Sequence, residues 1–333
     1  MALRCITIIV AFFDEISIEK AYSHILIASC IYTYLRGWRD LDIWGVIVER
    51  LIHAAEVVYT AVVDGKIKQA VEYIPQGKAT FPLGTVSPFQ NNKLIQKFNE
   101  FENFTGVVTI VNSAFRECSA LVEIAVPENV INLGSSFCYN ATSLKKVVFA
   151  GDKISYIPFA AFYQCTKMNV FEIPSKVTSI SEAAIQCESL TRLTLPATLI
   201  SVGNGAFRNP NYIQSWTILC KLQTIGQSAF KTAVFSSIDL SEIKTIGYGA
   251  FERSSLTSAD IGEKCSSIAS AAFFGCSTME QVIIRAATPP ALGNINAFGG
   301  ASSYPIYVPS AYLADYQSTS PWSSLGSRLQ AIP

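Results

Sequence analysis

The sequence predicts an α/β-type repeat solenoid, in which short parallel β-strands alternate with irregular or short helical return segments behind a helical N-terminal segment. A phenylalanine, usually preceded by alanine, recurs at intervals of 21 to 25 residues, and an isoleucine fills the one missing place. Units of this length cannot bury their own hydrophobic residues, so neighbouring units must stack on one another. The recurring positions are Phe115, Phe137, Phe162, Ile185, Phe207, Phe230, Phe251, Phe273 and Phe298.

Each recurring position has the same local surroundings. An aliphatic residue lies five residues earlier in most units, although Leu133 lies four residues before Phe137. A leucine or methionine follows, then a short alternating stretch such as Ile124-x-Val126-Pro127. Alternation indicates a strand with one inward row of side chains, and proline ends such a strand because it has no N–H to pair. We therefore expect one strand per unit and a continuous column of phenylalanine rings in the core.

Two segments contain nearly the whole pattern: Ile157 to Ile173 (IPFAAFYQCTKMNVFEI) and Ile268 to Ile284 (IASAAFFGCSTMEQVII). They resemble the BspA-like leucine-rich repeats of Bacteroides-type bacterial surface proteins. The stretch from Lys93 to Ile110 resembles the usual lead-in of that family, and Thr288 to Trp322 resembles its usual C-terminal ending. The resemblance implies a secreted or surface-exposed module that mediates adhesion to host proteins or other cells, with no catalytic residues.

The chain is expected to have four parts: a helical leading segment of uncertain role (1–85), an N-terminal cap (86–104), about nine leucine-rich repeats (105–300) and a C-terminal cap (301–333). Ser87-Pro88 followed by Leu94, Ile95, Phe98 and Phe101 suggests a short amphipathic helix over the first coil. Ala311 to Tyr316 and Trp322 to Leu329 suggest a helical cap closed by Trp322. Units near Ile185, Asn209-Pro210 and Ala233 depart from the pattern, so irregular coils are expected there.

Composition limits the possible partners. Half of the residues are hydrophobic and 15% are charged, which excludes intrinsic disorder. The 25 basic and 25 acidic residues balance, so nothing indicates a nucleic-acid partner. Four of the nine cysteines fall at one repeat position, which favours buried, reduced thiols over a disulfide framework, although stacked cysteines could oxidise. They are Cys118, Cys165, Cys187 and Cys276.

The leading segment holds several weak motifs. Ile27-Ala28-Ser29-Cys30 resembles a bacterial lipobox, but acidic residues precede it, so a buried helix is favoured and membrane attachment is expected only if Cys30 is lipidated. The stretch from Asp40 to Leu51 resembles a calcium loop but lacks the glutamate at position twelve, which favours a helix-capping turn. Localisation at the cell surface or outside the cell rests on the family resemblance.

The sequence offers no catalytic or cofactor site. Both histidines, His24 and His53, lie in the leading segment, so no Ser-His-Asp or Cys-His system can form within the repeats. His53 with Glu49 and Glu56 lacks a metal-site pattern and is expected on a solvated helix face. We therefore expect no enzyme, no metal and no cofactor.

The remaining candidate site is the outer surface of the predicted strands. Stacking is expected to align two ladders of outward residues, which either bind a protein or glycan ligand or are ordinary solvated strand residues. One ladder runs Glu123, Lys146, Val170, Arg192, Ser215, Ser237, Ser258 and Gln281, and the other runs Ala125, Val148, Glu172, Thr194, Thr217, Asp239, Asp260 and Ile283. The candidate ligand residues are Glu123, Lys146, Glu172, Arg192, Thr194, Thr217, Asp239 and Asp260.

Two other functions compete with adhesion. The chain could be a structural component or spacer of a larger assembly such as a phage fibre, because such repeats also decorate assemblies. It could also carry an enzyme within residues 1–85, but that segment is short and poor in motifs.

Overall fold

The computed structural model describes residues 80–81, 89–93, 95–98, 107–207, 212–300 and 303–333. The chain divides into two compact units, Met1–Lys78 and Ala79–Pro333, and the described residues, which form the solenoid, all belong to the second. The predicted leading helices, Cys30, the Asp40 loop and both histidines lie outside the described residues.

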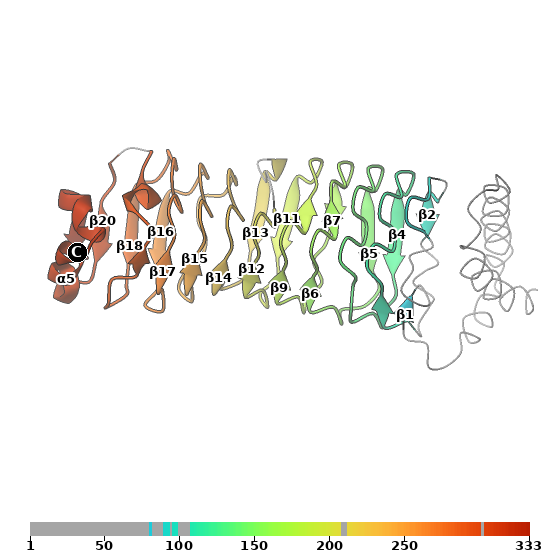
Figure 1. Cartoon of the computed structure of the whole chain (residues 1–333), viewed down its shortest axis with the longest axis horizontal. Coiled ribbons are helices and arrows are strands. Elements are labelled where there is room, and N and C mark those ends of the chain that lie inside the picture. The colour runs from blue at the N-terminus through green and yellow to red at the C-terminus, as the bar shows by residue number, and fades with distance from the viewer. Residues whose placement is uncertain (1–79, 82–88, 94, 99–106, 208–211, 301–302) are drawn as a thin grey trace, which may run out of the picture. The chain divides into compact units, whose positions relative to one another are not determined.

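The solenoid consists of stacked coils, and most coils contribute a strand to a long-strand face (Figure 1). These strands pair in parallel in three sheets, ordered β2-β4-β5-β8, β11-β13 and β16-β18-β20-β21. The predicted short parallel strands are therefore confirmed. Their bounds are β2 Lys97–Phe98, β4 Glu123–Val126, β5 Lys146–Phe149, β8 Val170–Phe171, β11 Arg192–Leu195, β13 Ser215–Ile218, β16 Ser258–Ile261, β18 Gln281–Ile284, β20 Ile306–Val308 and β21 Leu329–Ala331.

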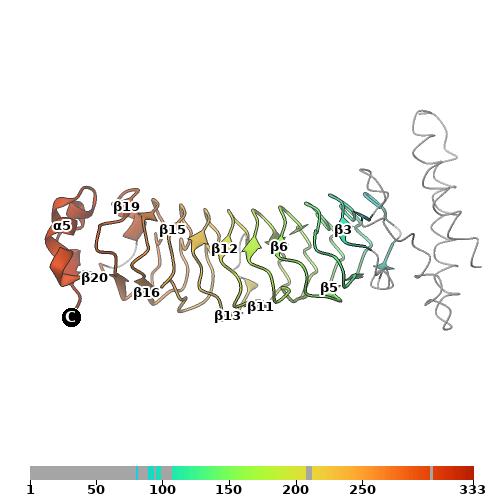
Figure 2. The ribbon, with the colours of Figure 1, turned by 90° about the horizontal axis from the view of Figure 1, so that it is seen from below.

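A second row of strands, which the sequence pattern did not predict, lies on another side of the coils (Figure 2). Seven two-residue strands form one parallel sheet in the order β19-β17-β15-β14-β12-β9-β6, which we call the short-strand sheet. Near its start, β3 (Thr109–Ile110) pairs with β1 (Thr80–Phe81). The seven strands are β6 Tyr156–Ile157, β9 Ser179–Ile180, β12 Ser201–Val202, β14 Thr224–Ile225, β15 Thr245–Ile246, β17 Ser267–Ile268 and β19 Ala291–Leu292. The return segments are otherwise turns and bends, with one further strand pair, β7 (Phe162–Tyr163) with β10 (Ile185–Gln186).

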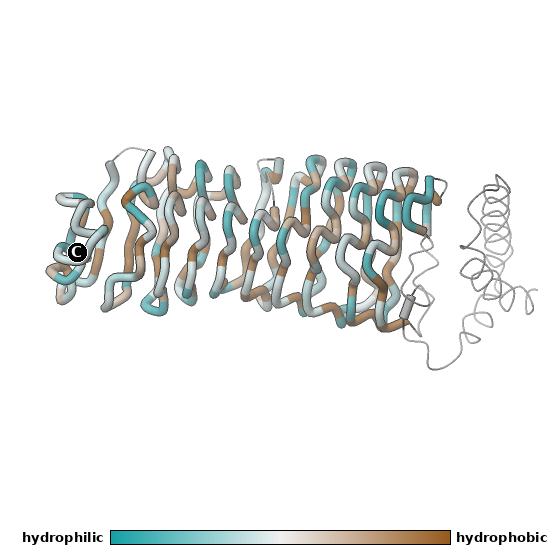
Figure 3. Tube along the Cα trace, in the orientation of Figure 1, coloured by the Kyte–Doolittle hydropathy of each residue, from teal (hydrophilic) through white to brown (hydrophobic). Residues whose placement is uncertain are grey.

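The predicted phenylalanine column is confirmed. All the recurring phenylalanines are at most 1% exposed, and rings in neighbouring coils have centroids 5.2 to 5.9 Å apart. This spacing is that of favourable aromatic pairs. Ile185 interrupts the column, pairs in register with Phe162 and is 3% exposed. Hydrophobic segments recur accordingly along the solenoid (Figure 3).

In the coil of Phe137, the column phenylalanine occupies a backbone position one residue earlier than in the neighbouring coils. The N–H of Phe115 donates to the carbonyl of Phe137, whereas the N–H of Cys138 donates to the carbonyl of Ala161, as the N–H of Phe162 does to Ala184. Cys138 therefore occupies the phenylalanine position and Phe137 the alanine position. This shift explains why Leu133 appears one residue too close to Phe137: it lies five residues before Cys138.

The predicted amphipathic helix at the N-terminal cap is wrong where the structure describes it. Lys97–Phe98 is a strand that pairs with Glu123–Ile124, because the segment is part of a coil and its backbone joins the sheet. Phe89 stacks on Phe115 with ring centroids 5.4 Å apart and extends the column by one member. Ser87, Pro88, Leu94 and Phe101 lie outside the described residues.

The C-terminal cap is helical, as predicted. After the short η3 (Ile295–Phe298), strand β20 leads into η4 (Ser310–Tyr312), α5 (Leu313–Ser318) and η5 (Trp322–Arg328). Trp322 is fully buried against Phe298 and Tyr316, and its indole N–H donates to the carbonyl of Pro290 over 2.7 Å. One detail differs, since Leu329 begins strand β21 instead of ending the helix.

The predicted irregularity in the middle of the array also appears. The long-strand face is interrupted between β13 and β16, where Leu240 forms only an isolated bridge to Ile261. Residues 208–211, which contain Asn209-Pro210, lie outside the described part of the chain.

Candidate ligand-binding face

The eight candidate residues all lie on or beside the long-strand face, but in three separate groups. Glu123 pairs in register with Lys146, Thr194 pairs with Thr217, and Asp260 lies on β16. Glu172 directly follows β8, and Asp239 precedes the isolated bridge residue Leu240. The expectation of two continuous ladders is therefore wrong, because the strands separate into three sheets with breaks after β8 and β13. Ala125, expected to point outward, is only 3% exposed.

Four of the candidate residues take part in ion pairs between adjacent coils. Glu123 lies 3.8 Å from Lys146, and Asp239 lies 3.8 Å from Lys221. Arg285 donates two hydrogen bonds of 2.6 and 2.7 Å to Asp260, and the same contact raises the pKa of its guanidinium. Exposed pairs of this kind stabilise by at most about 1 kcal/mol each. Their side chains are thereby committed to neighbours in the solenoid.

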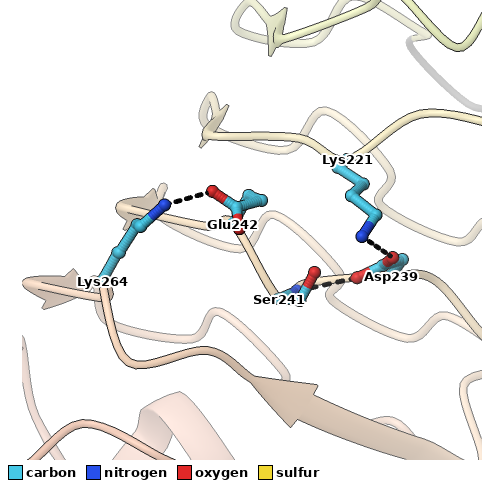
Figure 4. Close-up of polar contacts among 5 residues, drawn as sticks. All are labelled: Lys221, Asp239, Ser241, Glu242 and Lys264. Carbon is cyan, nitrogen blue, oxygen red and sulfur yellow. Dashed lines mark hydrogen bonds and ion pairs between the residues drawn. The ribbon is translucent and has the colours of Figure 1, made fainter.

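The neighbourhood of Asp239 shows how this side chain is held (Figure 4). The backbone N–H of Ser241 donates to the Asp239 carboxylate over 2.9 Å, and Lys221 approaches it from the preceding coil. Hydrogen bonding from Ser241, with a smaller contribution from Lys221, lowers the pKa of Asp239. Next to it, a hydrogen bond and ion pair from Lys264 lower the pKa of Glu242. The carboxylates of Asp239 and Glu242 therefore form ion pairs that link adjacent coils.

The other four candidate residues are exposed and make no side-chain contact of this kind within the described part of the chain. Among the described residues, no side-chain hydrogen bond or ion pair is seen for Glu172, Arg192, Thr194 or Thr217. Val170, which is 45% exposed, and Ser215, the register partner of Arg192, lie among them. We call this set the central strip: Val170, Glu172, Arg192, Thr194, Ser215 and Thr217. It presents one acid, one base and three hydroxyls from three consecutive coils.

A second row of at least partly exposed polar side chains, which the sequence pattern did not predict, lies on the short-strand sheet. Five consecutive strands present a hydroxyl in register, which we call the hydroxyl ladder: Ser179, Ser201, Thr224, Thr245 and Ser267. The signal was present, since a serine or threonine precedes the regularly spaced aliphatic residue in each of these units. It was not recognised because no strand was expected there.

Comparison with known families decides the classification. The model of the BspA type leucine-rich repeat region, which contains six repeat copies, matches residues 88–214 and 182–295. Together these matches cover more than half of the chain. The chain belongs to the BspA-type leucine-rich repeat family. The sequence resemblance to this family is thus confirmed. None of the curated proteins matches the chain.

Several solved structures resemble this BspA-type solenoid at low identity. A leucine-rich repeat protein from Bacteroides ovatus is 18% identical with a TM-score of 0.42, over 61% of this chain and 59% of that one. The pneumococcal vaccine antigen PcpA is 16% identical with a TM-score of 0.36, over 68% and 70%. A leucine-rich cell surface protein from Faecalibacterium prausnitzii is 16% identical with a TM-score of 0.30, over 71% and 86%.

The cysteines of these BspA-type repeats have a structural role. In four coils the thiol donates to a backbone carbonyl beside the column in the preceding coil, with distances of 2.8 to 3.6 Å. The seven cysteines that the structure describes are all reduced and buried, as predicted. Burial raises the thiol pKa, to about 12 for Cys118 and Cys165 and about 11 for Cys220 and Cys265. Thiols with such pKa values stay protonated at neutral pH and are poor nucleophiles.

Other kinds of site are not seen in the described part of the solenoid. No group of three or more histidine, cysteine, aspartate or glutamate side chains there is placed to hold a metal ion. None of its helices has the length and apolar character needed to cross a membrane. The long-strand face and the hydroxyl ladder therefore remain the surfaces to consider.

Proposed function

We propose that the chain is a non-catalytic binding or adhesion module, secreted or exposed on the surface of a bacterial cell, that contacts a protein or glycan partner through the central strip. Membership of the BspA-type family supports the general role. The observation that carries the choice of surface is the contrast along the long-strand face. Charged residues at both ends tie coils together, whereas Glu172 and Arg192 in the middle are exposed and uncommitted.

The central strip has the properties of a recognition surface. Its side chains project from β8, from Glu172 directly after it, and from β11 and β13; β8 pairs with β5, β11 pairs with β13, and the buried core lies behind them. Rigid presentation lowers the entropy that binding would otherwise cost. Opposite charges beside hydroxyls provide directional contacts, and Val170 adds exposed apolar area. Such a mixture suits a polar partner surface better than a small apolar ligand.

A catalytic role has no support in the repeats. The seven described thiols are buried with raised pKa values, and neither histidine of the chain falls within the repeats. Attachment to a membrane through a lipidated Cys30 stays a prediction, because that residue lies outside the described part of the chain.

A charge exchange tests the assignment. Glu172→Lys/Arg192→Glu reverses both charges of the central strip at constant net charge. Its matched control is Asp152→Lys/Lys176→Glu, an equally exposed exchange that preserves an inter-coil ion pair of 3.1 Å. Binding of the whole chain is measured on immobilised extracellular-matrix proteins and on a glycan array. We expect the central-strip variant to bind at least about tenfold more weakly at an unchanged melting temperature, since a like-charge contact costs more than about 1.4 kcal/mol.

The outcome separates the alternatives. Unchanged binding by Glu172→Lys/Arg192→Glu would rule out the central strip as the contact surface. An equal loss in the control variant would mean that general charge distribution, rather than this surface, determines binding.

A further inference from the structure

We propose that the hydroxyl ladder is a second binding surface, and that its ligand is an uncharged, extended polysaccharide lying along the solenoid axis. This inference is independent of the central strip, because the two surfaces lie on different sheets. It rests on the continuity of the short-strand sheet, on its free hydroxyls and on the scarcity of charge around them.

Continuity distinguishes this sheet from the long-strand face. The short-strand sheet runs unbroken through seven strands from β6 to β19, whereas the other face separates into three sheets. Its outward residues stay in register from Tyr156 through Ser179 and Ser201 to Ser267. Neighbouring strands lie about 4.8 Å apart, so the ladder repeats at that interval. A polymer that extends across the strands meets an equivalent group at every step, at a length close to one sugar residue of an extended chain.

The hydroxyls of the ladder are available to a ligand. Within the described part of the chain, none of the five makes a side-chain hydrogen bond, although the neighbouring hydroxyls of Thr178 and Ser266 donate to backbone carbonyls. Thr245 is exposed and the other four are partly exposed. A serine or threonine hydroxyl can both donate and accept, which matches the hydroxyls of a sugar.

The surroundings select an uncharged ligand. Four positions of each coil border the ladder: the ladder residue, the one before it, and the ones two and three places after it. In the six coils from Tyr156 to Ser270, only Glu182 and Lys244 among these positions are charged. A polyanion such as nucleic acid would need a row of basic residues there. Asn204 and Gln227, which are amides, and the hydroxyls provide neutral hydrogen-bonding groups instead.

Aromatic side chains complete the surface. Tyr156 stands in the ladder column directly beside Ser179, while Phe159 and Tyr248 are 50% and 51% exposed in the turns that follow β6 and β15. Rings exposed to this extent can stack against the apolar face of a pyranose ring. Hydroxyls for the sugar hydroxyls and rings for the sugar faces are the two contacts that recognition of a neutral glycan needs.

The test uses the whole chain and three soluble neutral polysaccharides: hydroxyethyl cellulose, a mixed-linkage β-glucan and a galactomannan. Affinity electrophoresis is expected to show retardation by at least one of them. Calorimetry with the corresponding oligosaccharides should then show affinity rising from the disaccharide to the hexasaccharide, as successive coils are engaged. Thr224→Val/Thr245→Val removes two adjacent hydroxyls and keeps the side-chain shape. We expect it to weaken binding about 25-fold, at about fivefold for each of the two hydrogen bonds lost.

Controls make the result specific. Thr142→Val/Thr191→Val removes two hydroxyls from other parts of the coil and should bind like the wild type. Tyr248→Ala should weaken binding without changing the melting temperature, because the ring is half exposed. Retardation by none of the polysaccharides, or equal retardation of wild type and Thr224→Val/Thr245→Val, would overturn the proposal. The proposal would also be overturned if Thr224→Val/Thr245→Val lost binding to a protein ligand but kept its binding to the polysaccharide.

Discussion

Phe162 shows at the scale of one residue why the solenoid depends on its column. The ring is fully buried and lies 5.9 Å from Phe137 and 4.8 Å from Phe171. Phe162→Ala removes these contacts and leaves a cavity, and we expect it to lower the free energy of unfolding by about 3–5 kcal/mol. Phe159→Ala in the same coil is the control, since that ring is 50% exposed and its loss should change stability by about 0.5 kcal/mol or less. Denaturant unfolding measures both, and a loss below about 1 kcal/mol in Phe162→Ala would contradict the packing role.

The thiols illustrate the same principle with weaker interactions. A thiol is a weak donor, and here it adds a second hydrogen bond to a carbonyl in the preceding coil that already accepts a backbone N–H. Where a described coil lacks cysteine at this place, the position holds Ala141, Ala233 or Ser254, which are also small and buried. The position therefore requires a small side chain, and the hydrogen bond is an addition in some coils.

Close contact between coils also limits which side chains can be accommodated next to the strands. Gly226 follows β14, and a Cβ atom there would lie 2.6 Å from backbone atoms of Gly203 and Asn204 in the preceding coil. We expect Gly226→Ala to cost about 3 kcal/mol, because backbone cannot move aside without separating the strands. Gly205 has a φ of +52° but nothing within 4 Å, so Gly205→Ala should cost only about 1 kcal/mol. Thermal unfolding of the two variants compares them, and equal losses would show that backbone conformation, not coil spacing, is limiting.

The elements that sequence predicted are those with a readable pattern. Strands such as β11 alternate over four residues, and the phenylalanine period fixed the stacking. Two-residue strands such as β12 contain no alternation to detect, so the short-strand sheet was missed. The exchange between Phe137 and Cys138 was hidden because both are apolar, and only backbone pairing distinguishes them.

The alternating pattern indicated which residues face outward, but not which of them form ion pairs. Asp239 and Asp260 are exposed, as the alternation predicted, although Asp239 lies outside any strand. Their partners, Lys221 and Arg285, lie beyond the ends of β13 and β18, and whether they reach these carboxylates depends on how the turns are stacked. Sequence periodicity carries no information on such contacts. It therefore could not distinguish the residues that form ion pairs from those that do not.

Across the whole solenoid, the stability of each coil should depend mainly on its two neighbours, because each coil contacts only those. The end of the array is therefore a place where one substitution has a graded effect. Trp322 covers the last column ring, Phe298, at 5.9 Å and is fully buried. Trp322→Ala removes this cover, and we expect it to destabilise the final coils by about 3–5 kcal/mol.

Hydrogen exchange along the chain reveals the gradient. In Trp322→Ala, amide protection should fall most in the strands nearest the cap, β18 and β20, less in β16, and little in β4 and β5. Tyr312→Ala is the matched control, because this cap residue is 39% exposed and should leave the protection pattern unchanged. A uniform loss of protection from β4 to β20 would instead show that the solenoid unfolds as one cooperative unit. In that case nearest-neighbour coupling would not describe this array, and the column would act as a single core.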